Sequence, residues 1–299
     1  MILEPSSQGR VAFSEWETWY RVTGDLNSKK APLVVAHGGP GCPHDYVLAL
    51  SQLALRGRAV IHYDQVGCGN STHLSEKGSD FWTVQLFLDE LANLVERIGI
   101  ADSYHLLGQS WGGMLGAEHA ITQPEGLRSL VISNSPASIE LWITEANRLR
   151  KGLPEDVQIV LDTHEANGTT EDPAYIEATQ IFYDRHVCRV IPNPPEVARA
   201  MELLGADPLV YRTMYGPNEF FCTGTLREWS VVDRVASISV PTLLASGRYD
   251  EATPATIQPF FDSIPDVRWE VFEESSHMPF VEEPERYLAV VGDFLVEHD

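Results

Sequence analysis

Basic residues are scarce in this 299-residue chain. Lys and Arg together number 21 against 43 Asp and Glu, which gives a formal net charge of -22. Such a chain would repel nucleic-acid phosphates, so we expect no nucleic-acid partner. A cationic substrate would be attracted, although we expect most of this charge to be solvated surface.

Cysteines and long apolar runs are also few. Four cysteines without CxxC spacing cannot form a disulfide scaffold, and neither HExxH nor a His/Cys cluster is present. No apolar run approaches the ~20 residues of a membrane helix. The first ten residues, MILEPSSQGR, do not read as a signal peptide. We therefore expect a reduced cytoplasmic protein, a monomer in the simplest case, with no metal, no cofactor and no membrane partner.

The remaining composition is suited to a folded α/β protein. Hydrophobic residues make up 43% of the chain, which is enough for a core. Alternating strand and helix patterns predict a mostly parallel sheet covered on both faces. The predicted strands span residues 9–13, 16–24, 31–38, 59–64, 103–108, 127–133, 241–247 and 268–274, and the predicted helices span 84–98, 111–123, 253–264 and 284–298.

The pattern changes in the middle of the chain. Four segments read as helices, several with proline near their start, where its missing N–H costs nothing. Because strands resume afterwards, we interpret residues 138–235 as a helical cap inserted into an α/β core of residues 1–137 and 236–299.

A serine stands at the end of one predicted strand. Residues 108–112 read Gly-Gln-Ser-Trp-Gly and match the G-x-S-x-G pattern between a strand and a helix. A plain glycine-rich turn would look similar. The strand-to-helix context favours Ser110 as a catalytic nucleophile.

A serine nucleophile needs a base and an acid, which follow it in the order Asp or Glu, then His, on this kind of fold. Far downstream, only His277 and His298 are available. His277 follows a predicted strand, whereas His298 lies in a tail expected to fray. Asp250 ends the preceding strand, although an aspartate there could simply cap the next helix. We predict Ser110, Asp250 and His277 as the triad.

The mechanism also needs hydrogen-bond donors for an oxyanion. The sequence HGGPG at residues 37–41 follows a predicted strand, and its glycines let backbone N–H groups face a ligand. We expect the backbone N–H groups of Gly39 and Trp111 to form the oxyanion hole.

Five motifs together resemble one family. The chain is similar to the proline iminopeptidase family of α/β-hydrolases, especially its tricorn-interacting aminopeptidases and the L-amino acid amidases. The resemblance implies an α/β-hydrolase fold with a cap, gives the triad roles to Ser110, Asp250 and His277, and assigns Glu219 and Glu251 to the substrate amine. It rests on HGGPG at 37–41, YDQVGCGNS at 63–71, GQSWGG at 108–113, YGPNEF at 215–220 and GRYDEATP at 247–254.

Two positions depart from the family pattern. Many members carry arginines in a DQRGCGRS loop, where this chain has Val66 and Asn70. The difference weakens an expectation of strict proline preference. Two carboxylates near the nucleophile remain suited to an ammonium group, because charge-assisted hydrogen bonds are strong.

The predicted function is therefore a serine hydrolase that cleaves the amide bond after a free N-terminal L-amino acid. Its partner would be a small molecule or short peptide with a free α-amino group. A specialist amidase that removes an aminoacyl protecting group in natural-product biosynthesis stays open, as does a general esterase or thioesterase. A ligand receptor on a hydrolase fold is the non-enzymatic alternative. Dehalogenases and epoxide hydrolases normally attack with aspartate, so Ser110 argues against them.

Overall fold

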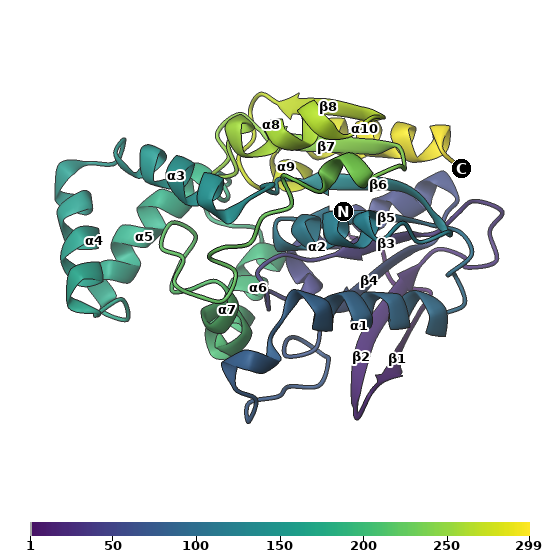
Figure 1. Ribbon diagram of the computed structural model, residues 1–299, viewed down its shortest axis with the longest axis horizontal. Coiled ribbons are helices and arrows are strands. Elements are labelled where there is room, and N and C mark those ends of the chain that lie inside the picture. The colour runs from purple at the N-terminus through teal and green to yellow at the C-terminus, as the bar shows by residue number, and fades with distance from the viewer. Residues whose placement is uncertain (1) are drawn as a thin grey trace.

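The computed structural model describes residues 2–299 and is built on one eight-stranded sheet (Figure 1). The strand order is β1-β2-β4-β3-β5-β6-β7-β8. β1 pairs with β2 and β2 with β4 in antiparallel fashion, and all other neighbours are parallel. The strands are Ser7–Phe13 (β1), Trp16–Thr23 (β2), Leu33–Ala36 (β3), Val60–Asp64 (β4), Tyr104–Gln109 (β5), Leu127–Ser133 (β6), Thr242–Gly247 (β7) and Val267–Phe272 (β8).

The central strands are buried on both faces. Every residue of β3, β4, β5 and β7 is buried, as expected for parallel strands covered by helices. Alternate residues feed two separate apolar clusters, because successive side chains point to opposite faces. Val34 and Leu106 contribute to one cluster, and Val35 and Leu107 contribute to the other.

Helices cover both faces. α1 (Val84–Arg97), α2 (Trp111–Ile121) and α8 (Pro254–Ser263) supply buried residues to the first cluster. The 3-10 helix η1 (His44–Arg56) and α10 (Pro284–Glu297) supply the second. The predicted mostly parallel sheet with helices on both faces is thus confirmed.

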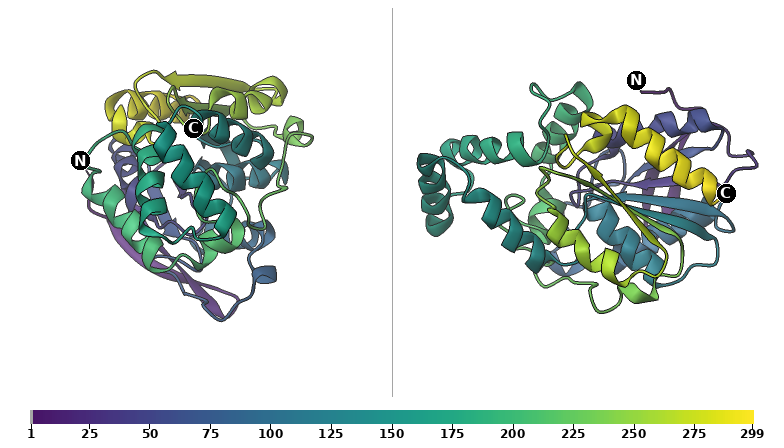
Figure 2. Two further views of the ribbon diagram at one scale, coloured as in Figure 1. Left: turned by 90° about the vertical axis from the view of Figure 1, so that its left-hand side faces the viewer. Right: turned by 90° about the horizontal axis from the view of Figure 1, so that it is seen from above.

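Five α-helices lie between β6 and β7: α3 (Ile139–Arg150), α4 (Glu155–Asn167), α5 (Pro173–His186), α6 (Pro195–Ala206) and α7 (Leu209–Met214). In Figures 1 and 2, α4 and the adjoining part of α5 extend away from the sheet. α6 packs on η1 and so returns the chain to the core. We interpret this inserted helical segment as a cap over the carboxyl ends of the strands.

Local sequence explains where the cap helices begin. α5 and α6 both have proline in the first turn, where no backbone N–H is needed. The side chain of Asp172 accepts a hydrogen bond from the backbone N–H of Ala174 at 2.9 Å and caps α5.

Several short elements were not predicted from the sequence. They are η1, α7, α9 (Pro279–Glu282) and the 3-10 turns η2 (Ser79–Phe81) and η3 (Val235–Ser237). None of the helices formed by residues 2–299 is both long and apolar enough to cross a membrane.

Candidate active site

Ser110 occupies a sharp turn between β5 and α2. Its backbone has φ 56° and ψ -123°, a conformation that a residue with a side chain rarely adopts. The turn is tight because the flanking glycines approach other backbone closely. A Cβ on Gly108 would lie 1.9 Å from the carbonyl oxygen of Gly112, and one on Gly112 would lie 2.1 Å from that of Ala36. The sequence therefore builds an elbow that presents Ser110 at the end of the strand.

His277 and Asp250 meet at the same edge of the sheet. Asp250 follows β7, and His277 lies in the loop after β8. The Nδ1 atom of His277 lies 2.7 Å from Oδ1 of Asp250. Both side chains are buried, and His277 shares a cavity with Ser110. The structure thus brings the three predicted triad residues to one region.

The carboxylate of Asp250 is held on both oxygens. Its Oδ1 also accepts the backbone N–H of Ala252 at 2.8 Å, and its Oδ2 accepts the side-chain amide of Asn134 at 2.6 Å. The Asn134 amide also donates to the carbonyl of Ser276 at 3.2 Å, next to the histidine. Asn134 therefore fixes Asp250 relative to the loop that carries His277. Its position at the end of β6 was the only sequence signal for this role.

His298 lies elsewhere. It follows α10 and is next to Asp299, whose carboxylate pairs with Arg58 at 3.0 Å and lies 3.5 Å from His105. His105 is the second residue of β5, at the other end of this strand from Ser110. His298 therefore lies near the amino ends of the parallel strands, whereas Ser110 lies at their carboxyl ends.

The HGGPG loop packs directly against the elbow. A Cβ on Gly38 would lie 2.9 Å from the Cβ of Ser110, so only glycine allows this approach. Gly39 has φ 109° and lines the cavity together with Ser110. Trp111 begins α2 immediately after the nucleophile. Both predicted oxyanion donors therefore belong to segments that adjoin Ser110.

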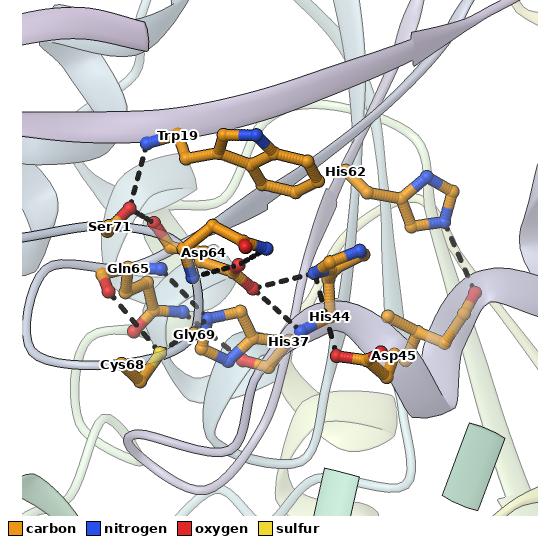
Figure 3. A network of polar contacts seen from close by, with 12 residues as sticks. Trp19, His37, His44, Asp45, His62, Asp64, Gln65, Cys68, Gly69 and Ser71 are labelled. Carbon is orange, nitrogen blue, oxygen red and sulfur yellow. Dashed lines mark hydrogen bonds and ion pairs between the residues drawn. The ribbon is translucent and has the colours of Figure 1, made fainter. Parts of the chain in front are cut away.

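Behind this loop lies a buried polar network (Figure 3). Asp64 accepts two hydrogen bonds from His44, one from its backbone N–H at 2.9 Å and one from the Nδ1 atom of the histidine ring at 2.8 Å. It also accepts hydrogen bonds from the backbone and side chain of Asn70. Burial alone would raise the pKa of Asp64, but His44 and the other donors outweigh it and lower that pKa to about 2. Asn70, at one of the departing positions, thus helps hold a carboxylate that also binds His44, at the start of η1 just after the HGGPG loop.

His37, Asp64 and Cys68 lie close enough together to share a metal ion. Their polar atoms are already engaged within the protein. The Nε2 atom of His37 accepts the backbone N–H of Gln65 at 3.0 Å, and the thiol of Cys68 donates to the carbonyl of Gln65 at 3.3 Å. Burial raises the pKa of Cys68, which disfavours a thiolate ligand. We interpret the cluster as structural support for the HGGPG loop.

Glu251 has an unusual environment. It is fully buried, lines the cavity, and neither carboxylate oxygen has a hydrogen-bond partner among residues 2–299. Its Oε1 lies 3.9 Å from Nε2 of His277. Burial raises the pKa of Glu251 well above its usual value, and the neighbouring carboxylates of Glu219 and Asp250 raise it further. A cation in the cavity would stabilise the ionised form of Glu251 and so oppose this rise in its pKa.

Glu219 reaches the same cavity from the cap. Its Oε1 accepts the hydroxyl of Tyr211 at 2.5 Å, and its backbone carbonyl accepts the indole N–H of Trp142 at 2.6 Å and the hydroxyl of Tyr215 at 2.8 Å. Burial raises the pKa of Glu219, while the hydrogen bond from Tyr211 and the proximity of His277 oppose that shift. The cap thus holds this carboxylate in a fixed position.

The cavity itself has a volume of about 320 Å³ and extends from the nucleophile into the cap. Away from Ser110 its walls come from α5, α6 and the start of α7. These walls are mostly apolar or aromatic: Tyr175, Ile176, Tyr183, Val187, Met201, Leu204, Pro208 and Tyr211.

Comparisons with known proteins agree with this geometry. Residues 31–284 match the family model described as alpha/beta hydrolase fold. The solved structure of VinJ has 56% sequence identity and a TM-score of 0.98, covering 99% of this chain and 100% of that one. The proline iminopeptidase of Mycobacterium smegmatis has 52% identity and a TM-score of 0.91, covering 98% of each chain.

Curated relatives indicate which family of alpha/beta hydrolases this chain resembles. The proline iminopeptidase of Lactobacillus delbrueckii subsp. lactis is 39% identical over 97% of this chain and 98% of its own length. That of Clostridium botulinum is 38% identical over 98% of this chain. The fold and its serine elbow define an alpha/beta hydrolase. Within that class, the chain belongs to the proline iminopeptidase family, as its motifs indicated.

Proposed function

We propose that this protein is a serine aminopeptidase or amidase that hydrolyses the amide bond after a free N-terminal L-amino acid. The observation that carries the proposal is the pair of carboxylates, the buried Glu251 and the partly exposed Glu219, in the cavity that also holds Ser110 and His277. The names of the full-length relatives support the same reaction.

In the proposed mechanism, Ser110 attacks the amide carbonyl while His277 takes its proton. Asp250 orients His277 through the 2.7 Å hydrogen bond and stabilises the imidazolium that forms. The backbone N–H groups of Gly39 and Trp111 stabilise the oxyanion. His277 then protonates the leaving amine, and an acyl-enzyme remains. Water, activated by the same histidine, releases the free amino acid.

The two glutamates would select the substrate. An α-ammonium group placed beside Glu251 would supply the donors that its carboxylate lacks among residues 2–299. Glu219 would contribute the second charge from the cap, with Tyr211 holding its carboxylate. A general esterase or thioesterase has no need of two carboxylates lining the cavity of its nucleophile, which makes that alternative less favoured.

The cavity also bears on the leaving group. Its only Lys or Arg lining residue among residues 2–299 is Arg212, which pairs with Glu171. The terminal carboxylate of a peptide would find no free cation there, whereas an apolar amine would fit the walls formed by α5 and α6. This observation favours the second candidate, a specialist amidase that removes an aminoacyl group from an apolar amine.

The test compares two substrates. A charged hydrogen bond contributes ~1.5–3 kcal/mol, or roughly tenfold to 150-fold in rate or affinity. Glu219→Gln keeps the shape of the side chain and removes its charge. It should lower kcat/KM for an alanyl-arylamide by about that factor and leave hydrolysis of a simple aryl ester nearly unchanged, while Ser110→Ala should abolish both. Equal losses on both substrates, or no loss on either, would reject amine recognition by Glu219.

A further inference from the structure

A continuous hydrogen-bond chain joins the HGGPG loop to the loop that carries His277. The backbone N–H of Gly38 donates to the hydroxyl oxygen of Tyr46 at 2.6 Å. That hydroxyl donates to Oε1 of Gln109 at 2.5 Å. The side-chain amide of Gln109 then donates to the backbone carbonyl of His277 at 3.1 Å. Tyr46 and Gln109 are both buried, at 3% and 1% exposure, so water does not compete for these bonds.

The direction of the chain is fixed by chemistry. A backbone N–H can only donate, so the oxygen of Tyr46 must accept from Gly38 and its single proton is free for Gln109. The carbonyl of His277 can only accept, so it requires the NH₂ end of the glutamine. A flipped Gln109 would set two acceptors against each other at His277. Each group therefore has one role, which makes the chain a rigid connection rather than a set of interchangeable contacts.

The chain joins three parts of the proposed catalytic apparatus. Gly38 precedes Gly39, the proposed oxyanion donor, and Gln109 precedes Ser110. His277 is the proposed base. Tyr46 comes from η1, which is neither a strand end nor part of the cap. This series of hydrogen bonds therefore connects the segments that carry the proposed donor, nucleophile and base, and it does so through Tyr46, which belongs to none of them.

A second connection holds the other side of the same loop. The indole N–H of Trp111 donates to Oε1 of Gln65 at 2.8 Å, and the amide of Gln65 donates to the carbonyl of His37 at 3.3 Å. The HGGPG loop is thus held on one side by Tyr46 and on the other by Gln65. Only the Tyr46 side also reaches the base.

We propose that Tyr46 and Gln109 are positioning residues for catalysis, which set the oxyanion donor at Gly39 relative to Ser110 and His277. The inference rests on the proposed serine mechanism. Tyr46 lies on the wall of the substrate cavity, but its hydroxyl is engaged by Gly38 and Gln109, so we expect its effect to belong to the transition state and to be independent of the substrate amine. Burial also raises the pKa of Tyr46, which keeps its hydroxyl protonated as a donor.

A second buried tyrosine of the protein offers a matched control for the test. Tyr63 is also fully buried, but its hydroxyl has no hydrogen-bond partner among residues 2–299. Tyr63→Phe therefore removes the same atom as Tyr46→Phe without breaking a bond. Any general effect of losing a buried tyrosine hydroxyl should be visible in both variants.

Tyr46→Phe should lower kcat by about 10- to 100-fold, because small displacements of catalytic groups and lost oxyanion donors cost rates of this order. The loss should be equal on an alanyl-arylamide and on an aryl ester, with KM for the arylamide within about threefold of wild type, since uniform binding is untouched. Tyr63→Phe should keep kcat within about twofold. Thermal unfolding of each variant separates lost catalysis from lost fold.

If Tyr46→Phe and Tyr63→Phe have the same kcat, the positioning role is wrong. A loss confined to the arylamide, or confined to KM, also overturns it. Should Tyr46→Phe fail to fold, Gln109→Met, which breaks the chain at its next member, must show the same kcat loss on both substrates. Ser110→Ala separates the two claims, because activity retained in that variant rejects the serine mechanism itself.

Discussion

Replacement of Glu90 should make the protein more stable at alkaline pH. This glutamate lies in α1 and is fully buried, with the hydroxyl of Thr18 donating to its Oε1 at 2.5 Å and the backbone N–H of Val66 donating at 2.9 Å. Burial raises the pKa of Glu90 from 4.5 to about 8, although these hydrogen bonds oppose the shift. The carboxyl group is therefore mainly protonated at neutral pH in the folded state.

The sign of the effect follows from proton binding. Because the folded state has the higher pKa, it binds the proton more tightly than the unfolded chain does. The stability that this proton contributes is complete below pH 4.5 and is lost as the pH rises through about 8. Each pH unit in that window changes the free energy of unfolding by ~1.36 kcal/mol. From pH 6 to pH 8, the Glu90 contribution therefore falls by roughly 2–3 kcal/mol.

Glu90→Gln imitates the protonated form and does not titrate. Its advantage over wild type should therefore be roughly 2–3 kcal/mol larger at pH 9 than at pH 6. Urea unfolding curves of both proteins at the two pH values give the difference directly, and all other titrating groups cancel in the comparison. An advantage that is the same at both pH values would refute the reasoning and show that burial does not raise the pKa of Glu90.

Two further predictions concern the proposed site. His277→Ala should reduce turnover by a factor that can approach about a millionfold for a triad member, while His298→Ala, at the far edge of the sheet, should leave kcat within about twofold; a silent His277→Ala would reject the base assignment. Burial raises the pKa of Glu219 and of Glu251. As the pH rises above 4.5, the ordinary glutamate value, the ratio of arylamide to ester kcat/KM should therefore increase, because the carboxylates ionise and hold the ammonium better. Protonation of the base would affect both substrates alike, so a constant ratio would contradict the carboxylate role.

The strands and the positions of the site residues could be predicted because each rests on a local pattern. Apolar runs bounded by glycine mark β3, β5 and β7, and parallel strands bring their carboxyl ends to one edge. Residues that follow those ends, such as Ser110 and Asp250, must then lie near each other. The order of the triad along the chain restricted the choice to His277 and His298, and the expected fraying of the tail favoured His277.

The supporting residues could not be predicted, because their roles depend on tertiary contacts. Tyr46 lies in η1, which was not predicted from the sequence, and an aromatic residue there resembles ordinary core. Gln109 occupies the variable position of the elbow motif, so the motif itself gives it no role. Glu90 falls at helical spacing from Phe87 and Leu94, which puts it on the buried face of α1. That signal was present, but a glutamate in an acidic protein is more often solvated.

Three unfavourable features lie around the proposed nucleophile, and they differ in what could relieve them. Ser110 and Asn134 both have positive φ, at 56° and 53°, and such backbone costs of order 1–3 kcal/mol per residue. These two conformations are fixed by the buried strands that precede them, so they persist whether or not a ligand is present. Glu251 is different, because its carboxylate has no hydrogen-bond donor among residues 2–299, and a donor from a ligand would change its energy at once. In the proposed function, an ammonium group would supply the donors that this buried carboxylate lacks, and one uncompensated residue would thereby select for a free N-terminus.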